Sequence, residues 1–223
     1  MIVGVRSGGI TVSQGRIVYV VDALNNRILK YSHEGKLILK WGNLGWSNGE
    51  FNFPGGIAVD NMSGNIYVAD SGNDRVQVFN SDGEFQSSWG TQGSGDGQFS
   101  SPEGVAVDES GNVYVVELGN NRIHVLDEKG RFRYKWGTRG TGNGQFDRPT
   151  RVALDGEGNV YVTDTDNHRV QVFDSEGRFL AKWGSKGPNI DQFNSPSAIA
   201  IDASGRVYVG DSSRPFRVFA PVK

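Results

Sequence analysis

The chain contains no cysteine among its 223 residues, which excludes disulfide bonds and cysteine-ligated metal sites. It also lacks any apolar run approaching the roughly 18 residues that a membrane-spanning helix requires. Its first residues, MIVGVRSGG, include no basic segment followed by an apolar core, so they do not resemble a secretory signal peptide. We therefore expect a soluble chain and assign it to no cellular compartment.

A charge excess of either sign is missing as well. The 23 lysines and arginines are nearly balanced by 25 aspartates and glutamates, which gives a net charge of -2. Proteins that bind nucleic acids or anionic membranes typically carry a basic excess or stripe. We therefore do not expect RNA or a membrane as a partner.

The sequence does contain a repeat that runs from end to end. The dipeptide Trp-Gly begins at Trp41, Trp89, Trp136 and Trp183, in steps of 48, 47 and 47 residues. An acidic residue closes a Tyr-Val run with the same spacing, at Asp22, Asp70, Glu117, Asp164 and Asp211. A period of this length indicates a solenoid, a propeller or another array. We predict one domain over 1–223, with repeats at about 9–53, 54–101, 102–148, 149–195 and a partial one at 196–223.

Each repeat predicts four short β-strands. In the third repeat they are GVAVD, NVYVVE, RIHVLD and RFRYKWG, which alternate apolar and polar residues. Short Gly-, Asn- and Asp-rich turns separate them, so consecutive strands should pair antiparallel. No helical periodicity is visible. A repeated four-stranded meander is the blade of a β-propeller.

The number of strands predicts an all-β propeller of five blades. The last repeat provides only three strands, and the segment Ile2–Arg6 is the remaining strand-like stretch. We predict that it closes the last blade as its outer strand. If the short link after Arg6 cannot reach, the ring is incomplete and a partner would complete it.

The motifs of the repeat resemble those of the NHL family. The segment PTRVALDGEGNVYVTDTDNHRVQVFDSEGRFLAKWGSKG, residues 149–187, carries Asn167, His168 and Arg169 at the core of the family signature. The resemblance extends over about residues 9–219 and implies a propeller, usually one of six blades. The known roles of the family include protein-binding and RNA-binding platforms, sensor domains and an amidating lyase. The fold alone does not select among these roles.

Two sets of repeated residues have both a structural and a functional interpretation. Arg27, Arg75, Arg122 and Arg169 follow the acidic residue of each repeat by five positions and form either strand-to-strand ion pairs or a ligand-binding ring. We favour the ion pairs. The Trp-Gly tryptophans either pack between blades, which we favour, or form an exposed stacking platform. The last repeat has Pro215 and Phe216 where the arginine is expected, so its blade should be irregular.

Candidate binding residues lie where the repeats differ. Trp46 stands in an otherwise polar long loop, and it is either an exposed binding anchor or a residue folded back onto its blade. Glu103 and Arg151 are the only charges just after the repeat prolines, at the expected channel mouth. They either bind a zwitterionic or peptide group or pair with each other. Arg139 and Arg148 add positive charge to the same loop face.

Residues for catalysis or metal binding are few. His33, His124 and His168 occupy three different positions within their repeats, so we expect no zinc site. We find no nucleophile elbow, phosphate-binding loop or calcium loop. We therefore expect no catalytic residues, no cofactor and no enzyme activity.

The function we predict is that of a non-catalytic binding or scaffold module. Its long-loop face and channel mouth would receive a protein or peptide, through Glu103, Arg151, Arg148, Arg139 and Trp46. Alternatives are a metal-dependent lactonase or lyase, an RNA-binding platform, and an engineered or structural repeat without a ligand. We expect a monomer, or an oligomer if the ring is incomplete.

Overall fold

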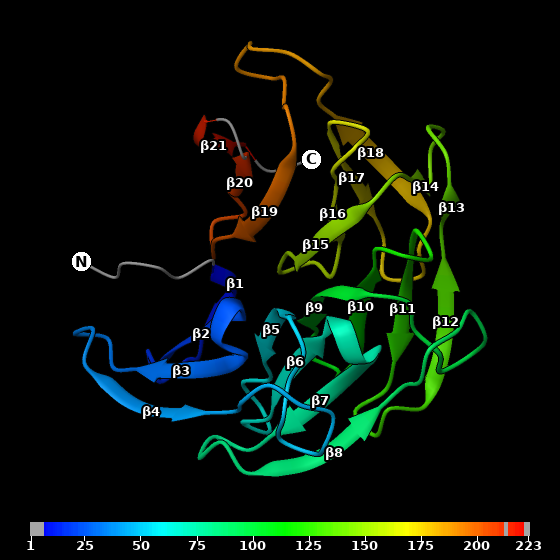
Figure 1. The fold of residues 1–223 in the computed structure, drawn as a ribbon. Helices are drawn as coiled ribbons and strands as arrows, with labels where there is room; N and C mark the ends of the chain where they lie inside the picture. Colours follow the sequence, from blue (N-terminus) through cyan, green and yellow to red (C-terminus); the bar gives the residue numbers. More distant parts are fainter. Residues whose placement is uncertain (1–6, 212–213, 221–223) are drawn as a thin grey trace. The chain divides into compact units, whose positions relative to one another are not determined.

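The chain forms an all-β propeller of five antiparallel blades, as the repeat predicts (Figure 1). The computed structural model describes residues 7–211 and 214–220. Each blade is a meander whose strands neighbour one another in chain order. Blade 1 comprises β1 (Ser7–Val12), β2 (Val18–Asp22), β3 (Arg27–Tyr31) and β4 (Leu37–Trp41), and blade 2 comprises β5 (Pro54–Val59), β6 (Ile66–Asp70), β7 (Arg75–Phe79) and β8 (Phe85–Trp89). Blade 3 comprises β9 (Pro102–Val107), β10 (Val113–Glu117), β11 (Arg122–Leu126) and β12 (Phe132–Trp136), blade 4 comprises β15 (Pro149–Leu154), β16 (Val160–Asp164), β17 (Arg169–Phe173) and β18 (Phe179–Trp183), and blade 5 comprises β19 (Pro196–Ile201), β20 (Val207–Asp211) and β21 (Arg214–Phe219).

Contacts divide the chain into two units that are described separately. Unit 1 contains residues 1–115 and 126–133, and unit 2 contains residues 116–125 and 134–223. Blades 1 and 2 belong to unit 1, blades 4 and 5 belong to unit 2, and the division passes through blade 3.

The strands follow the alternation of the sequence. All five residues of β6 and of β7 are buried, because these central strands are covered on both faces. The outer strand β8 instead alternates between exposed and half-buried residues, as expected for a strand with one solvated face. The third-strand hairpin turns use glycine at positive φ, for example Gly83 at 77°.

The cores lie between neighbouring blades. In unit 1, Tyr19, Val21 and Ile28 of blade 1 pack against Ile66 and Val68 of blade 2. The Trp-Gly tryptophans pack at these junctions, which confirms the structural interpretation. Trp41 lies 5.9 Å from Phe79 between ring centroids in unit 1, and Trp183 lies 5.5 Å from Phe219 in unit 2.

Two short helices and a small sheet occupy the connections. The 3-10 turns η1 (Ala23–Asn25) and η2 (Ser71–Asn73) follow the second strands of blades 1 and 2. No helix in the described part of the chain is long and apolar enough to span a bilayer. The strands β13 (Thr138–Arg139) and β14 (Gln145–Phe146) form a parallel pair within one long loop, which the sequence did not indicate.

The ends of the chain depart from the regular repeat. In blade 5 the pairing of β20 with β21 shifts register between Val209 and Asp211, so the expected irregularity is confirmed. The predicted closing strand Ile2–Arg6 lies outside the described residues.

Candidate functional site

The long loop 42–53 connects β4 to β5 in unit 1 and is closed on itself by backbone hydrogen bonds. Leu44 and Phe51 form a parallel β-bridge. The Phe51 amide donates to the Asn43 carbonyl at 2.8 Å, and the Gly45 amide donates to the Phe51 carbonyl at 3.0 Å. Equivalent bridges close the three other long loops that the structure describes. The loop therefore has a defined shape before any side chain is considered.

Side chains of blade 2 hold the backbone of this loop in place through hydrogen bonds. Arg75 Nη2 donates to the carbonyls of Ser47 and Glu50, both at 2.8 Å. Gln77 donates to the Glu50 carbonyl at 2.6 Å and accepts from the Gly49 amide at 2.9 Å. Asn73 donates to the Gly45 carbonyl at 2.9 Å. Loop backbone groups that water would otherwise have to satisfy are thus fixed by the next repeat.

A buried carboxylate, Asp70, holds the bracing side chains in place. Its side chain is fully buried and lies 2.7 Å from Nε of Arg75. It also accepts hydrogen bonds from Asn73, Gln77 and the Asn52 amide. The same carboxylate-to-arginine pair recurs at Asp22–Arg27, Glu117–Arg122 and Asp164–Arg169. The ion-pair interpretation of the repeated arginines is therefore confirmed.

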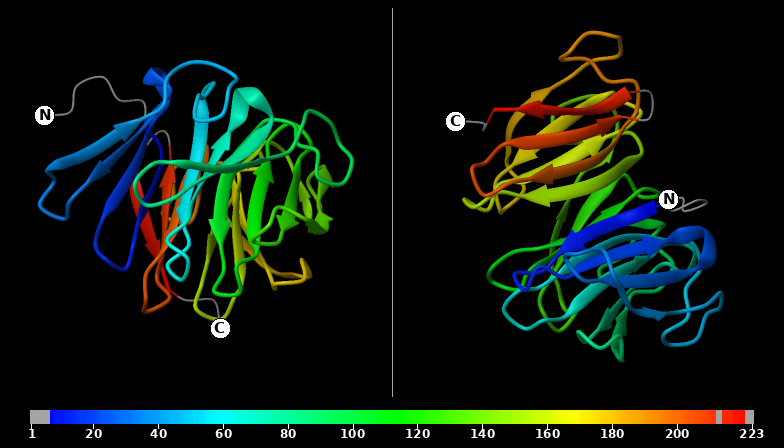
Figure 2. Two further views of the ribbon diagram at one scale, coloured as in Figure 1. Left: turned by 90° about the horizontal axis from the view of Figure 1, so that it is seen from below. Right: turned by 90° about the vertical axis from the view of Figure 1, so that its left-hand side faces the viewer.

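The tip of the braced loop presents apolar side chains to solvent. Trp46 is 80% exposed, so it is not folded back onto its blade. Leu44 and Phe53 on the same loop and Leu24 on η1 are also exposed. The Phe53 amide donates to Asn26 Oδ1 at 2.7 Å, which ties the loop to the η1 connection. The left-hand view of Figure 2 shows the loop after β4 and η2 at the same end of their sheets.

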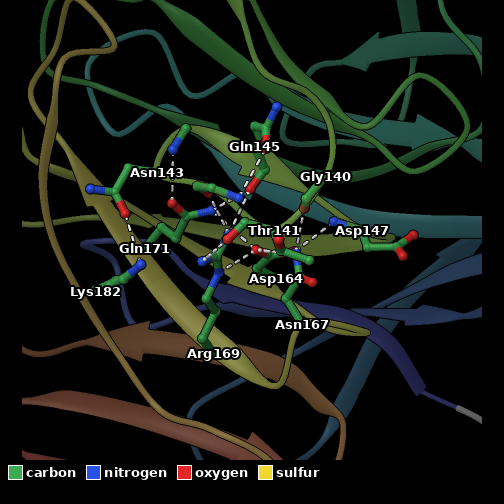
Figure 3. Close-up of polar contacts among 12 residues, drawn as sticks. Gly140, Thr141, Asn143, Gln145, Asp147, Asp164, Asn167, Arg169, Gln171 and Lys182 are labelled. Carbon is green, nitrogen blue, oxygen red and sulfur yellow. Dashed lines mark hydrogen bonds and ion pairs between the residues drawn. The ribbon is translucent and has the colours of Figure 1, made fainter.

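In unit 2, Asp164, Asn167, Arg169 and Gln171 form the same buried set of bracing side chains, called the frame below (Figure 3). The loop that this frame holds has different side chains at its tip. Arg169 donates to the carbonyls of Thr141, Gly142 and Gln145 in loop 137–148, and Gln171 donates to the Gln145 carbonyl at 2.7 Å. Burial raises the pKa of Asp164, and hydrogen bonds from the Asp147 amide, Asn167 and Arg169 oppose that rise.

The predicted basic residues Arg139 and Arg148 lie on this second loop. Arg139 Nε is 3.6 Å from Asp147, and Arg148 Nε is 3.7 Å from Asp166. Both arginine side chains remain largely exposed, so these ion pairs are weak ones at the surface. The structure therefore brings Arg139 and Arg148 together with acidic residues rather than into an uncompensated basic patch.

The two predicted channel-mouth charges belong to different units. Glu103 in unit 1 accepts a hydrogen bond from the Ser71 hydroxyl at 3.2 Å. Arg151 in unit 2 donates to the Thr150 carbonyl at 3.0 Å. Their roles in ligand binding stay predictions.

Three exposed apolar residues near Trp46 were missed from the sequence. Leu44 and Phe53 occupy positions where the other repeats have Gln92, Arg139 and Lys186, and Ser101, Arg148 and Ser195. A position-by-position comparison of the repeats, applied to the whole loop, would have found both. Leu24 occupies the position of Gly72 and Asp166 on the adjoining turn.

The ionisable residues show no arrangement suited to a metal. Within residues 7–211 and 214–220, no group of three or more His, Asp or Glu side chains could hold an ion. The acidic turns serve the backbone instead: Asp108 accepts from the amides of Ser110 and Asn112. His124 is fully buried, with Nδ1 3.1 Å from Glu117, in the position that Gln77 and Gln171 take in their blades.

Sequence comparison identifies the repeat. A family description named "NHL repeat" matches residues 51–79, 99–126 and 146–173. The chain carries NHL repeats. Each matched segment runs from the phenylalanine that closes the β-bridge of a long loop to the end of the third strand, so it contains the buried frame described above. No curated protein sequence matches this chain.

Solved structures share the propeller fold at low sequence identity. A streptogramin B lyase aligns with a TM-score of 0.69 and 14% identity over 97% of this chain and 69% of that one. A nidogen/laminin complex aligns with a TM-score of 0.68 and 20% identity over 96% of this chain and 80% of that one. A Bacteroides thetaiotaomicron protein of unknown function aligns with a TM-score of 0.72 and 18% identity over 97% of this chain and 60% of that one. At such identities the likeness establishes the fold alone.

Proposed function

We propose that this NHL-repeat protein is a non-catalytic binding module that receives a protein or peptide on the tip of loop 42–53. Trp46 is the anchor, and Leu44 and Phe53 extend the apolar contact. An exposed tryptophan on a braced loop carries this proposal, because ordering costs little when the loop is already fixed.

Two further observations support this function. Tryptophan is among the residues that contribute most to protein interfaces, since its ring buries a large area with few rotatable bonds. The fold is also compatible with protein binding, because one solved structure with this fold is a complex of nidogen with laminin.

A peptide selection tests the proposal. The purified protein is used to select peptides from a random displayed library, and each selected peptide is titrated against the Trp46→Ala variant. Loss of an interface anchor should weaken binding by about 30-fold. The Met62→Ala variant is the matched control, because Met62 is equally exposed but lies in the β5–β6 turn of the same unit.

The control also defines the contrary result. If Met62→Ala weakens the selected peptides as much as Trp46→Ala does, or if neither changes them, the loop is not the binding site. Thermal unfolding with added calcium or zinc addresses the competing enzyme function, since a metal that binds only the folded state must raise the unfolding temperature.

A further inference from the structure

Loop 42–53 carries a carboxylate where the other long loops carry a neutral amide. Glu50 takes the position that glutamine has in those loops, at Gln98, Gln145 and Gln192. The Oε2 atom of Glu50 accepts a hydrogen bond from the Ser47 amide at 3.0 Å. The side-chain oxygen of each glutamine accepts from the equivalent amide of its own loop, at 2.9 to 3.1 Å. The bond that shapes these loops therefore needs an oxygen acceptor but not a negative charge.

The carboxylate of Glu50 lies beside the residue that carries the exposed indole. Its Oε2 atom occupies the space that a Cβ on Gly45 would need and is bonded to the Ser47 amide, so it lies against the residues on either side of Trp46. Its Oε1 atom accepts from Asn43 Nδ2 at 3.2 Å. The hydrogen bonds from Ser47 and Asn43 hold the pKa of Glu50 below its ordinary value, so this group is ionised at neutral pH.

The charge of Glu50 has no basic partner in the described part of the chain. No described lysine, arginine or histidine forms an ion pair with it. Arg139 and Arg148 of the second loop, by contrast, each have an acidic neighbour. Since glutamine would preserve the loop and no ion pair uses the charge, the carboxylate is available for contact with a partner.

The loop end of unit 1 is also acidic by sequence. The described segments of this unit at that end are 23–26, 42–53, 71–74 and 90–103. They contain no lysine, arginine or histidine, and their acidic residues are Glu50, Asp74, Asp96 and Glu103. A surface with charges of one sign attracts a partner of the opposite sign. The charge at this end of unit 1 therefore favours a basic partner.

We propose that the partner of loop 42–53 places a positively charged side chain, for which arginine fits best, against the indole of Trp46 and the carboxylate of Glu50. This assignment rests on the proposed binding function of the loop. A guanidinium group stacks on an aromatic face, forms two parallel hydrogen bonds to a carboxylate and is less strongly hydrated than an ammonium group. Leu44 and Phe53 contact apolar residues that flank the arginine. The ligand is therefore a peptide segment with an arginine among apolar residues.

Peptide selection on three forms of the full chain tests this assignment. A random displayed library is selected separately on the native chain, on Glu50→Gln and on Glu84→Gln. The first variant gives the loop the residue of the other long loops, so the fold is retained. The second removes an exposed carboxylate from the β7–β8 turn of the same unit and is the matched control. Arginine should be enriched in peptides selected on the native chain and on the control, but not on Glu50→Gln.

Titration of one selected peptide measures the contact directly. The peptide is made with its arginine and with lysine or the neutral analogue citrulline in its place. Glu50→Gln should weaken the arginine peptide about tenfold and leave the citrulline peptide unchanged, because citrulline has no charge for the carboxylate to bind. The lysine peptide should bind the native chain with intermediate affinity, since it keeps the charge but lacks the planar fork. Added salt should weaken the arginine peptide more in the native chain than in Glu50→Gln.

The contrary results separate this assignment from the binding function itself. Peptides that depend on Trp46 but are not enriched in arginine, and whose affinity is the same for Glu50→Gln, overturn the cationic partner and leave the binding loop in place. A library that yields no peptide dependent on Trp46 overturns both. If Glu84→Gln weakens the arginine peptide as much as Glu50→Gln does, the effect comes from net charge, and the proposed contact is wrong.

Discussion

Loop 42–53 in unit 1 and loop 137–148 in unit 2 are held by the same buried frame but differ in the chemistry of their tips, which is apolar in the first loop and polar in the second. In each, a buried Asp–Asn–Arg–Gln set from the following blade holds the loop carbonyls, through Asp70 and its neighbours or through Asp164 and its neighbours. The first loop ends in Leu44 and Trp46, whereas the second has Arg139 and Thr141 at these positions. The shape of the loop is therefore independent of the chemistry at its tip.

This separation lets the residues at the tip of a long loop vary between repeats while the loop keeps its shape. The frame is buried and over-determined by hydrogen bonds, so its residues recur in nearly the same form. The tip side chains are largely exposed, so they can change without altering the backbone. The apolar tip suits an anchor contact, while the paired charges of the second loop do not.

Removing the frame carboxylate should have the largest effect. Asp70→Ala leaves the guanidinium of Arg75 buried without its charged partner, so we expect the free energy of unfolding to fall by about 3 to 5 kcal/mol. Asp164→Ala should do the same to Arg169 in unit 2. Urea unfolding measures both, with the exposed Asp82→Ala as the control. Losses near those of the control would show that the frame does not stabilise the loops.

The ion pair of the frame was predictable from the sequence, but the hydrogen bonds from the frame to the preceding long loop were not. The recurrence of Asp70 and Arg75 five residues apart identified an ion pair, because both ends lie within one repeat. The contacts from Arg75 to Ser47 join residues 28 positions apart in different repeats. Local patterns contain no information on such long-range contacts, so the bracing of the loops appeared only in the structure.

The period of the repeat likewise predicted the strands but not which faces are covered. Alternation marks Ile10 and Ile57 as equivalent, since both lie on the inner face of their strands. Whether a second sheet covers such a face depends on contacts between repeats, as where blade 1 packs on Ile57 of blade 2. Trp46 was left open for a related reason, because exposure depends on the folded loop.

Removing one hydrogen bond between the frame and a loop should increase the mobility of that loop alone. Asn73→Ala removes the hydrogen bond to the Gly45 carbonyl, at a cost of about 1 kcal/mol. Amide hydrogen exchange should accelerate at Gly45 and Gly49 while loop 137–148 keeps its protection. Asn167→Ala should reverse the pattern. Uniform loss of protection across the chain would contradict the independence of the two loops.

Exchanging the tips should change binding with almost no change in stability. Leu44→Arg combined with Trp46→Thr gives the first loop the tip of the second, and we expect the free energy of unfolding to stay within about 0.5 kcal/mol. Peptides selected on the native protein should no longer bind the double variant. A large loss of stability would show that the tip contributes to the frame.

The smallest effect concerns carboxylates at the opposite end of the sheets, which are partly exposed rather than fully buried. The pKa of Asp174 lies below its ordinary value. Burial alone would raise this pKa, but the hydrogen bonds from the side chain and amide of Arg178 lower it by more than burial raises it. A carboxyl group whose pKa is lower in the folded state stabilises the fold above the unfolded pKa of about 3.9, and this contribution disappears as the pH falls through the folded pKa.

Asp174→Asn should therefore lower the unfolding temperature by about 1 °C or less at neutral pH, and by nothing at a pH below the folded pKa. Differential scanning calorimetry at both pH values measures the change. A loss at neutral pH as large as that of Asp164→Ala would mean that a partly exposed turn carboxylate and a fully buried frame carboxylate contribute equally, which the difference in burial between the two argues against.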